Sequence, residues 1–219
     1  MNISKNIKKY KDELPENIKL VAISKTKPNE DLLEAYEAGQ RIFGENKIQE
    51  MTDKWESLPK DIEWHMVGHV QRNKVKYMAP FVGLIHAVDS LKLLKEINKR
   101  AKNEERVIKC LLQIKIAEED SKFGISKEEA EEILNSEAYN KMENTEVVGL
   151  MGMATFTEDE NQVKSEFLKL KAIFDDFKEK YPSMKELSMG MSGDYKIAVE
   201  CGSTMVRIGS SIFGERNYN

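Results

Sequence analysis

The first residue in this sequence that could do chemistry is a lysine at the end of an apolar run. Leu20-Val21-Ala22-Ile23 precedes Ser24-Lys25, and four consecutive apolar residues are typical of a strand buried on both faces. Side chains alternate along a strand, so Lys25 shares a face with Val21 and Ile23. A partly desolvated lysine amine loses its proton more easily and can form a Schiff base with an aldehyde. The alternative is an ordinary lysine whose amine reaches solvent at the end of the strand.

Two turns rich in small residues lie near the end of the chain and suit an anion. They are Ser188-Met189-Gly190-Met191-Ser192-Gly193-Asp194 and Met205-Val206-Arg207-Ile208-Gly209-Ser210-Ser211. In the first turn Ser192 is expected to be the helix N-cap, Gly193 allows close approach to the backbone, and free amides point at one spot. Ordinary capping and chain reversal explain either turn alone. Together with Lys25, they predict a site for a phosphorylated aldehyde, and pyridoxal 5′-phosphate fits this description.

Arg207 has a specific electronic meaning in such a site. Its guanidinium stays protonated, so against the pyridine nitrogen of the cofactor it would donate a hydrogen bond and keep that nitrogen unprotonated. The ring would then be a weaker electron sink than one paired with an aspartate. A structural salt bridge at the mouth of a barrel is the alternative interpretation of Arg207.

The elements that must position these residues alternate regularly along the chain. Strands are expected at 20–24, 41–43, 63–68, 81–88, 107–116, 147–153, 187–189 and 204–208, with helices between them. Eight strand–helix units predict an α/β fold, a (β/α)8 TIM barrel forming a single domain over 1–219. Residues 1–18 are expected to add a leading helix, and a doubly wound open sheet is the alternative that the count of eight disfavours.

Helix boundaries are also predicted from local signals. Ser126 to Glu129 and Thr157 to Glu160 both have the spacing of a capping box, so a helix is expected to begin at each. Gly39 and Gly202 are expected to end the helices before them. In parallel α/β proteins the chemistry lies where strands end, which is where Lys25 and both turns fall.

Composition narrows the class of protein. The formal charge is 34 − 38 = −4, which disfavours nucleic-acid binding because that needs a basic surface. The sequence contains no run of about 18 apolar residues, so no membrane span is predicted. The first residues lack the apolar stretch of a secretory signal. Cys110 and Cys201 lie in apolar surroundings and are expected to be reduced, buried thiols. We therefore expect a cytoplasmic protein.

Histidine positions offer no convincing metal centre. His65 and His69 are four residues apart, but they straddle the end of a strand and enclose no glutamate, so no metal site is predicted. His86 lies near Asp89, which leaves a catalytic pair open, although a histidine with its hydrogen bonds satisfied at the barrel rim is the favoured interpretation. Met151 and Met153 are expected to line the barrel.

Five segments together resemble the pyridoxal phosphate homeostasis proteins, small single-domain relatives of the alanine racemase barrel. The segments are Val21-Ala22-Ile23-Ser24-Lys25-Thr26-Lys27-Pro28, Phe43-Gly44-Glu45-Asn46, Trp64-His65-Met66-Val67-Gly68-His69-Val70-Gln71-Arg72-Asn73-Lys74, Leu187-Ser188-Met189-Gly190-Met191-Ser192 and Gly202-Ser203-Thr204-Met205-Val206-Arg207-Ile208-Gly209. They span nearly the whole chain in the family's order. Residues 1–18 are shorter than the leading segment of many relatives.

The resemblance implies a role for each candidate residue. Lys25 would carry pyridoxal 5′-phosphate as an internal aldimine, Asn46 would contact the ring, and Arg207 would face the pyridine nitrogen. The residues implied to contact the phosphate are Ser192, Gly209 and Ser210, beside Gly193. Position 210 is serine where relatives often have threonine, so the hydroxyl is kept.

The resemblance also implies a role in pyridoxal phosphate homeostasis, as a carrier or buffer without catalytic turnover. Apo forms of pyridoxal phosphate-dependent enzymes are the implied protein partners, and a monomer is expected. The alternative is a pyridoxal phosphate-dependent racemase or a Schiff-base lyase. Racemisation needs a second acid or base on the opposite face of the cofactor. No tyrosine lies at an obvious strand end facing Lys25, so no catalytic residue is assigned.

Overall fold

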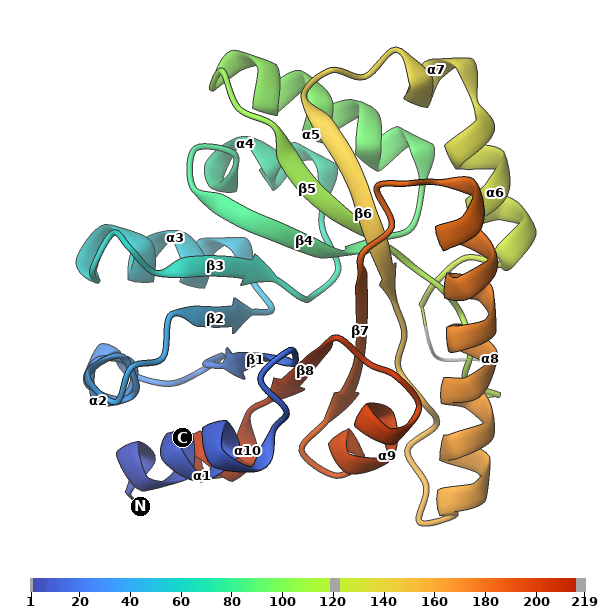
Figure 1. Cartoon of the computed structure of the whole chain (residues 1–219). Coiled ribbons are helices and arrows are strands. Elements are labelled where there is room, and N and C mark those ends of the chain that lie inside the picture. Colours follow the sequence, from blue (N-terminus) through green and yellow to red (C-terminus); the bar gives the residue numbers. More distant parts are fainter. Residues whose placement is uncertain (1, 119–122, 216–219) are drawn as a thin grey trace.

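The chain folds into one closed barrel of eight parallel strands, which confirms the predicted fold. The computed structural model describes residues 2–118 and 123–215. Neighbouring strands follow one another in chain order and β8 closes the barrel against β1, with helices arranged around the outside (Figure 1). The strands are β1 (Lys19–Ile23), β2 (Ile42–Glu45), β3 (Glu63–Met66), β4 (Val82–Val88), β5 (Ile108–Gln113), β6 (Thr145–Met151), β7 (Glu186–Met191) and β8 (Met205–Ile208).

Helices connect successive strands, and their lengths range from a single turn to 21 residues. They are α1 (Ile3–Glu13), α2 (Asn29–Glu37), α3 (Ile48–Ser57), η1 (Arg72–Lys74), α4 (Val75–Met78), α5 (Leu91–Asn103), α6 (Lys127–Asn135), α7 (Glu137–Asn140), α8 (Glu160–Lys180), α9 (Tyr195–Glu200) and α10 (Ser210–Phe213). The four-residue helices α7 and α10 were not predicted, because one turn shows no apolar periodicity. The segment after β3 is a 3-10 turn, η1, leading into α4.

Two apolar layers hold the barrel together. The inner layer fills the barrel and includes Val21, with Ile23 and Met153 packed against it. The outer layer lies between strands and helices and includes Leu20 and Ala22. The alternation predicted for the first strand is therefore confirmed, and it directs the side chain two residues after Ile23 toward the mouth of the barrel.

Of the two predicted capping boxes, one forms at the start of its helix and the other does not. Ser126 and Glu129 form the predicted capping box at the start of α6. The box predicted from Thr157 is wrong: Asp159 is the N-cap of α8, and its carboxylate accepts from the N–H groups of Asn161 and Gln162. The Thr157 hydroxyl instead accepts the N–H of Asp159, a turn that delays the helix by two residues.

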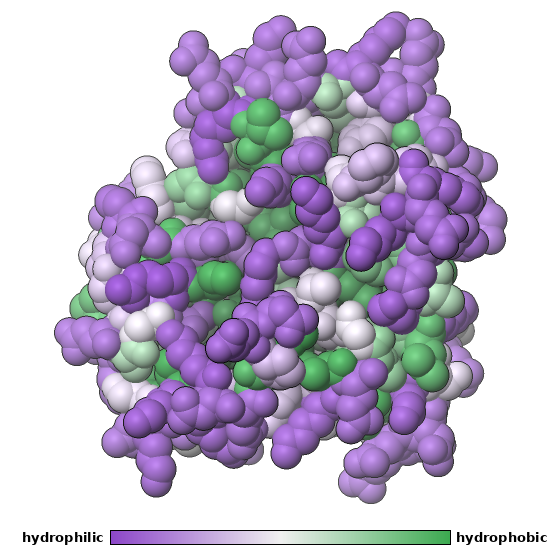
Figure 2. All heavy atoms as spheres, in the orientation of Figure 1, coloured by the Kyte–Doolittle hydropathy of each residue, from purple (hydrophilic) through white to green (hydrophobic). Residues whose placement is uncertain are grey.

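The surface drawn in Figure 2 is mostly polar, and both cysteines are buried free thiols as expected. Polar side chains cover most of the face drawn in Figure 2, and apolar atoms appear there in smaller patches. Cys110 and Cys201 are buried free thiols, and burial raises the pKa of both. Among the described residues, no helix is apolar enough over enough length to cross a membrane.

Candidate functional site

One cavity at the carboxyl ends of the strands collects every residue that the sequence singled out for ligand binding. Its volume is about 600 Å³. The predicted residues that line it are Lys25, Asn46, Ser192, Gly193, Arg207, Gly209 and Ser210. Residues from both ends of the chain thus meet at one site, as the barrel topology requires.

The turn that presents Lys25 has an unusual backbone. Thr26 adopts a left-handed conformation with φ +63°, which is rare for a β-branched residue. Its N–H donates to Glu50 Oε1 at 2.6 Å, and the N–H of Lys27 donates to the carbonyl of Ser24 at 3.1 Å. These bonds stabilise a turn that the Thr26 side chain disfavours.

The neighbouring Lys27 is engaged elsewhere. Its Nζ donates to the carbonyl oxygens of Phe213 and Glu215, both at 2.9 Å. This amine therefore fastens the segment after α10 to the turn.

A buried ionic cluster lies directly behind the Lys25 turn, and the sequence reading missed it. Lys54 Nζ donates to the Ser24 carbonyl, Glu45 Oε1 and Glu50 Oε1, each at 2.7 Å, while the Ser24 hydroxyl donates to Glu45 Oε1 at 2.6 Å. Lys54 is only 5% exposed and Glu45 is fully buried. Burial raises the pKa of Glu45, and the Lys54 ammonium opposes that rise. The cluster joins the end of β1 to α3 and so supports the turn that carries Lys25.

Arg207 is buried at the base of the cavity. Its Nη1 donates to Ser188 Oγ at 2.6 Å and its Nη2 donates to the Gly152 carbonyl at 3.0 Å. Burial lowers its pKa to about 10, against the opposing charge of Asp194. The guanidinium is therefore a cation at neutral pH and can only donate hydrogen bonds.

The two turns after β7 and β8 differ from the prediction in one respect. Ser192 is not the N-cap of α9; Asp194 is, and its carboxylate accepts the N–H of Met191 at 2.6 Å. Asp194 therefore occupies the N-cap position without a side-chain capping bond, and its carboxylate closes the turn before the helix instead. The Ser192 hydroxyl instead accepts the N–H of Gly209 at 3.3 Å, which links the two turns.

Unpaired donors remain in these turns. Within 2–118 and 123–215, no acceptor contacts the backbone N–H of Ser192, Gly193 or Ser210. A side chain built on Gly193 would meet no atom within 4 Å. Open space and unpaired amides on the wall of a cavity are what an anionic group requires.

A close approach of two strand ends explains Gly68. A Cβ on this residue would lie 2.4 Å from the carbonyl oxygen of Asn46, so only glycine fits there. The contact holds Asn46 at the rim of the cavity beside Lys25. The resulting donor set, with a lysine, a buried cation and three free amides, fits a phosphorylated aromatic aldehyde such as pyridoxal 5′-phosphate.

Histidines around the barrel are arranged differently from the prediction. His86 is in the barrel interior rather than at its rim, with its ring nitrogens bonded to Ser188 and His65. Asp89 lies instead near His69, whose Nδ1 is 3.6 Å from its carboxylate. The described residues form no cluster suited to a metal ion.

Comparison with known proteins defines the class. The family described as alanine racemase, N-terminal domain, matches residues 1–217. The pyridoxal phosphate homeostasis protein of Homo sapiens is 42% identical over 215 residues, which cover 92% of this chain and 78% of the human protein. That of Aquifex aeolicus is 40% identical over 202 residues, covering 91% and 88%.

A solved structure agrees with this grouping. PipY of Synechococcus elongatus with pyridoxal phosphate bound is 30% identical, with a TM-score of 0.87 over 97% of this chain and 100% of PipY. Fold and site thus define a barrel of the alanine racemase N-terminal type. The chain belongs to the pyridoxal phosphate homeostasis protein family.

Proposed function

We propose that this chain binds pyridoxal 5′-phosphate covalently on Lys25 and serves in its homeostasis as a carrier or buffer. The observation that carries the proposal is the convergence of Lys25, the buried Arg207 and the unpaired amides of both turns on one cavity. The whole chain, 1–219, would act as one cofactor-binding unit in the cytoplasm, with the leading helix as part of it.

Each residue would have a distinct part in binding. The Lys25 amine would condense with the aldehyde, Asn46 would lie against the ring, and Arg207 would donate to the pyridine nitrogen. The phosphate would take the amides of Ser192, Gly193 and Ser210 and the hydroxyls of the two serines, and it would lie against Gly209, whose N–H donates to Ser192 Oγ. When bound, the cofactor supplies an electron sink for carbanions, which Arg207 would weaken by keeping the ring nitrogen unprotonated.

Absence of turnover is the second part of the proposal. The described lining of the cavity contains no tyrosine, and His69 is its one imidazole. A racemase needs an acid or base on each face of the substrate, and the described lining offers no tyrosine as the partner of Lys25. A monomeric carrier that passes the cofactor to apo-enzymes fits these features.

A racemase remains the second candidate, because the matching family is described by the alanine racemase domain. Incubation of the loaded protein with L-alanine in deuterated water separates the two. The carrier proposal expects neither D-alanine nor deuterium at the α-carbon above background. Exchange that disappears in Lys25→Ala would make the protein an enzyme instead.

The direct test of binding is the absorption spectrum of the purified protein after pyridoxal phosphate is added. A visible band from the imine linkage supports the proposal. A protein that stays colourless and leaves the free cofactor concentration unchanged overturns it.

A further inference from the structure

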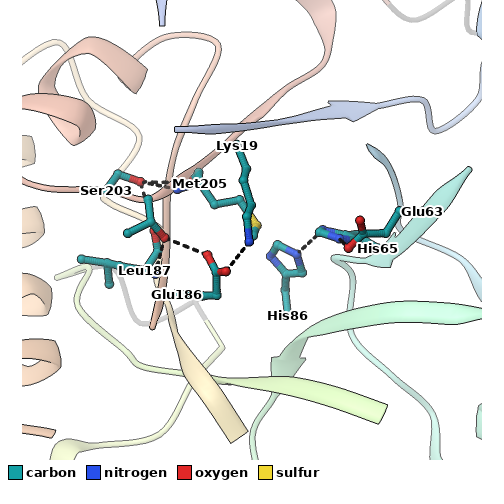
Figure 3. Close-up of polar contacts among 9 residues, drawn as sticks. Lys19, Glu63, His65, His86, Glu186, Leu187, Ser203 and Met205 are labelled. Atoms are coloured by element: carbon teal, nitrogen blue, oxygen red, sulfur yellow. Dashed lines mark hydrogen bonds and ion pairs between the residues drawn. The ribbon is translucent and has the colours of Figure 1, made fainter. Parts of the chain in front are cut away.

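A file of polar side chains crosses the apolar interior of the barrel, and cofactor binding as proposed does not account for it. Arg207 Nη1 is 2.6 Å from Ser188 Oγ, and Ser188 Oγ is 3.0 Å from His86 Nδ1. His86 Nε2 is 3.0 Å from His65 Nδ1, and His65 Nε2 is 3.0 Å from Glu63 Oε1. We call these five residues the histidine chain; Figure 3 shows its His86–His65–Glu63 part.

The histidine chain connects the two ends of the barrel. Arg207 lies at the cavity, where strands end, whereas Glu63 is the first residue of β3 at the opposite mouth. His86 and Ser188 are fully buried and His65 is 1% exposed, while the Glu63 side chain is 55% exposed. Buried polar groups in an apolar core are costly unless every donor and acceptor is matched, so the order of protons in this chain matters.

Arg207 and Glu63, the two ends of the histidine chain, impose the same order of protons along it. A guanidinium has only donors, so Ser188 Oγ accepts from Arg207 and its own proton goes to His86 Nδ1. His86 then carries its proton on Nε2 and donates to His65 Nδ1. An ionised carboxylate has only acceptors, so His65 must likewise carry its proton on Nε2 and donate to Glu63. Every link is satisfied with both imidazoles neutral.

The electrostatic surroundings agree with this order. Burial, together with the charges of His65 and Arg207, lowers the pKa of His86 well below its ordinary value. The bond from His65 lowers the pKa of Glu63, and Lys19 and Lys109 act in the same direction. Glu186, a further acid at this mouth, pairs with Lys19. A neutral His86 and an ionised Glu63 are therefore the favoured states.

We propose that Ser188, His86 and His65 are positioning residues that orient Arg207 toward the cofactor through a one-way hydrogen-bond chain anchored by Glu63. The chain holds Nη1 and the Gly152 carbonyl holds Nη2, which leaves the other N–H groups of the guanidinium to face the cavity. The part concerning the cofactor rests on the proposed role of Arg207, while the proton order stands independently of it.

The proton order is tested in the ligand-free protein by two-bond ¹H–¹⁵N spectra of the imidazoles. The protein has three histidines, so single substitutions assign their signals, and the exposed His69, which lies outside the histidine chain, serves as the comparison. We expect His65 and His86 to be neutral with the proton on Nε2 throughout pH 6–8. An imidazolium or an Nδ1–H form of either histidine would overturn the proposal.

The link to the cofactor is tested by substituting His86. His86→Leu removes both of its bonds, and we expect a roughly tenfold weaker affinity for pyridoxal phosphate and a shifted visible band. His86→Gln, which can accept from Ser188 and donate to His65, should restore both properties. Gln40→Leu is the matched control, because it also removes a buried side chain with two hydrogen bonds, to the carbonyls of Leu20 and Ile42, away from the cavity.

The outcomes separate this proposal from the proposed function. If folded His86→Leu and His86→Gln bind the cofactor and absorb as the native protein does, the histidine chain does not position Arg207. If His86→Leu does not fold, the spectra of the native protein and the His86→Gln variant still decide the matter. Failure of the native protein to bind pyridoxal phosphate would overturn the proposed function while leaving the proton order to the imidazole spectra.

Discussion

The two sides of the cavity differ in whether their hydrogen-bonding groups already have partners. Behind Lys25, the groups of the turn are engaged: Ser24, Glu45 and Lys54 bond one another within 2.7 Å. On the side of the two turns, the amides of Ser192 and Gly193 have no acceptor among the described residues. We infer that the lysine side is preorganised before the ligand arrives, whereas the turns become satisfied only by an anion. The lysine side should therefore determine stability, and the turns should determine affinity for phosphate.

The largest effect is expected at Lys25. Lys25→Ala should abolish the visible band completely, because the imine cannot form. Two or three charge-assisted hydrogen bonds to the phosphate, worth roughly 1.5–3 kcal/mol each, should still bind pyridoxal phosphate at about micromolar strength. Spectroscopic and calorimetric titration measure the two properties separately. Lys27→Ala is the control and should keep the band.

The next largest effect concerns the buried cluster. Lys54→Met leaves Glu45 and Glu50 without their cation, and breaking such a buried pair costs about 3–5 kcal/mol of unfolding free energy. Urea denaturation followed by circular dichroism measures the loss. Lys141→Met is the matched control, since Lys141 forms an exposed i,i+4 pair with Glu137 and should change stability little. Equal stability of the two variants would contradict a supporting role for the cluster.

A smaller effect is expected in the turn after β7. Gly193→Val adds atoms where no others lie, so the fold should keep its stability while the affinity for pyridoxal phosphate falls about tenfold, or 1.4 kcal/mol. Binding of unphosphorylated pyridoxal should be weak in the native protein and change less in the variant. Gly190→Ala provides the contrast, because φ is +97° there and a Cβ would lie 2.6 Å from that of Ala198. This second variant should lose stability.

The smallest effect is a pH dependence on the lysine side. Burial raises the folded-state pKa of Glu45 above its ordinary value of 4.5, so folding favours its protonated form. Its contribution to stability is therefore fully present below pH 4.5 and is lost as the pH rises through the raised pKa. Glu45→Gln should lack this dependence, so its stability relative to the native protein should increase with pH across that interval. Parallel curves from urea denaturation would show that the pKa of Glu45 is not raised.

Much of this arrangement follows from local patterns, and the exceptions have a common cause. Apolar runs predicted the eight strands, and the end of the first strand together with the two small-residue turns predicted six of the cavity residues, because each signal lies within a few neighbouring residues. Asn46 was expected there only from the family resemblance. Lys54 was missed because its acidic partner Glu45 comes from a different element, and no local pattern shows that the pair is buried. The histidine chain was missed for the same reason, since it is assembled from β3, β4, β7 and β8.

Competition between caps explains the remaining errors. Thr157 and Ser192 were expected to cap helices, but in each case an aspartate nearby takes that position. Serine, threonine and aspartate are all good caps, so sequence spacing alone does not rank neighbouring candidates. Both errors move the cap position by two residues and leave the cavity in place.

Borohydride reduction of the protein loaded with pyridoxal phosphate, followed by peptide mapping, tests the central claim most directly. Reduction converts the imine into a stable amine and marks the lysine that formed it. The account predicts a single pyridoxyl label, on Lys25. A label on Lys27 or on any other lysine, or no label at all, would contradict it.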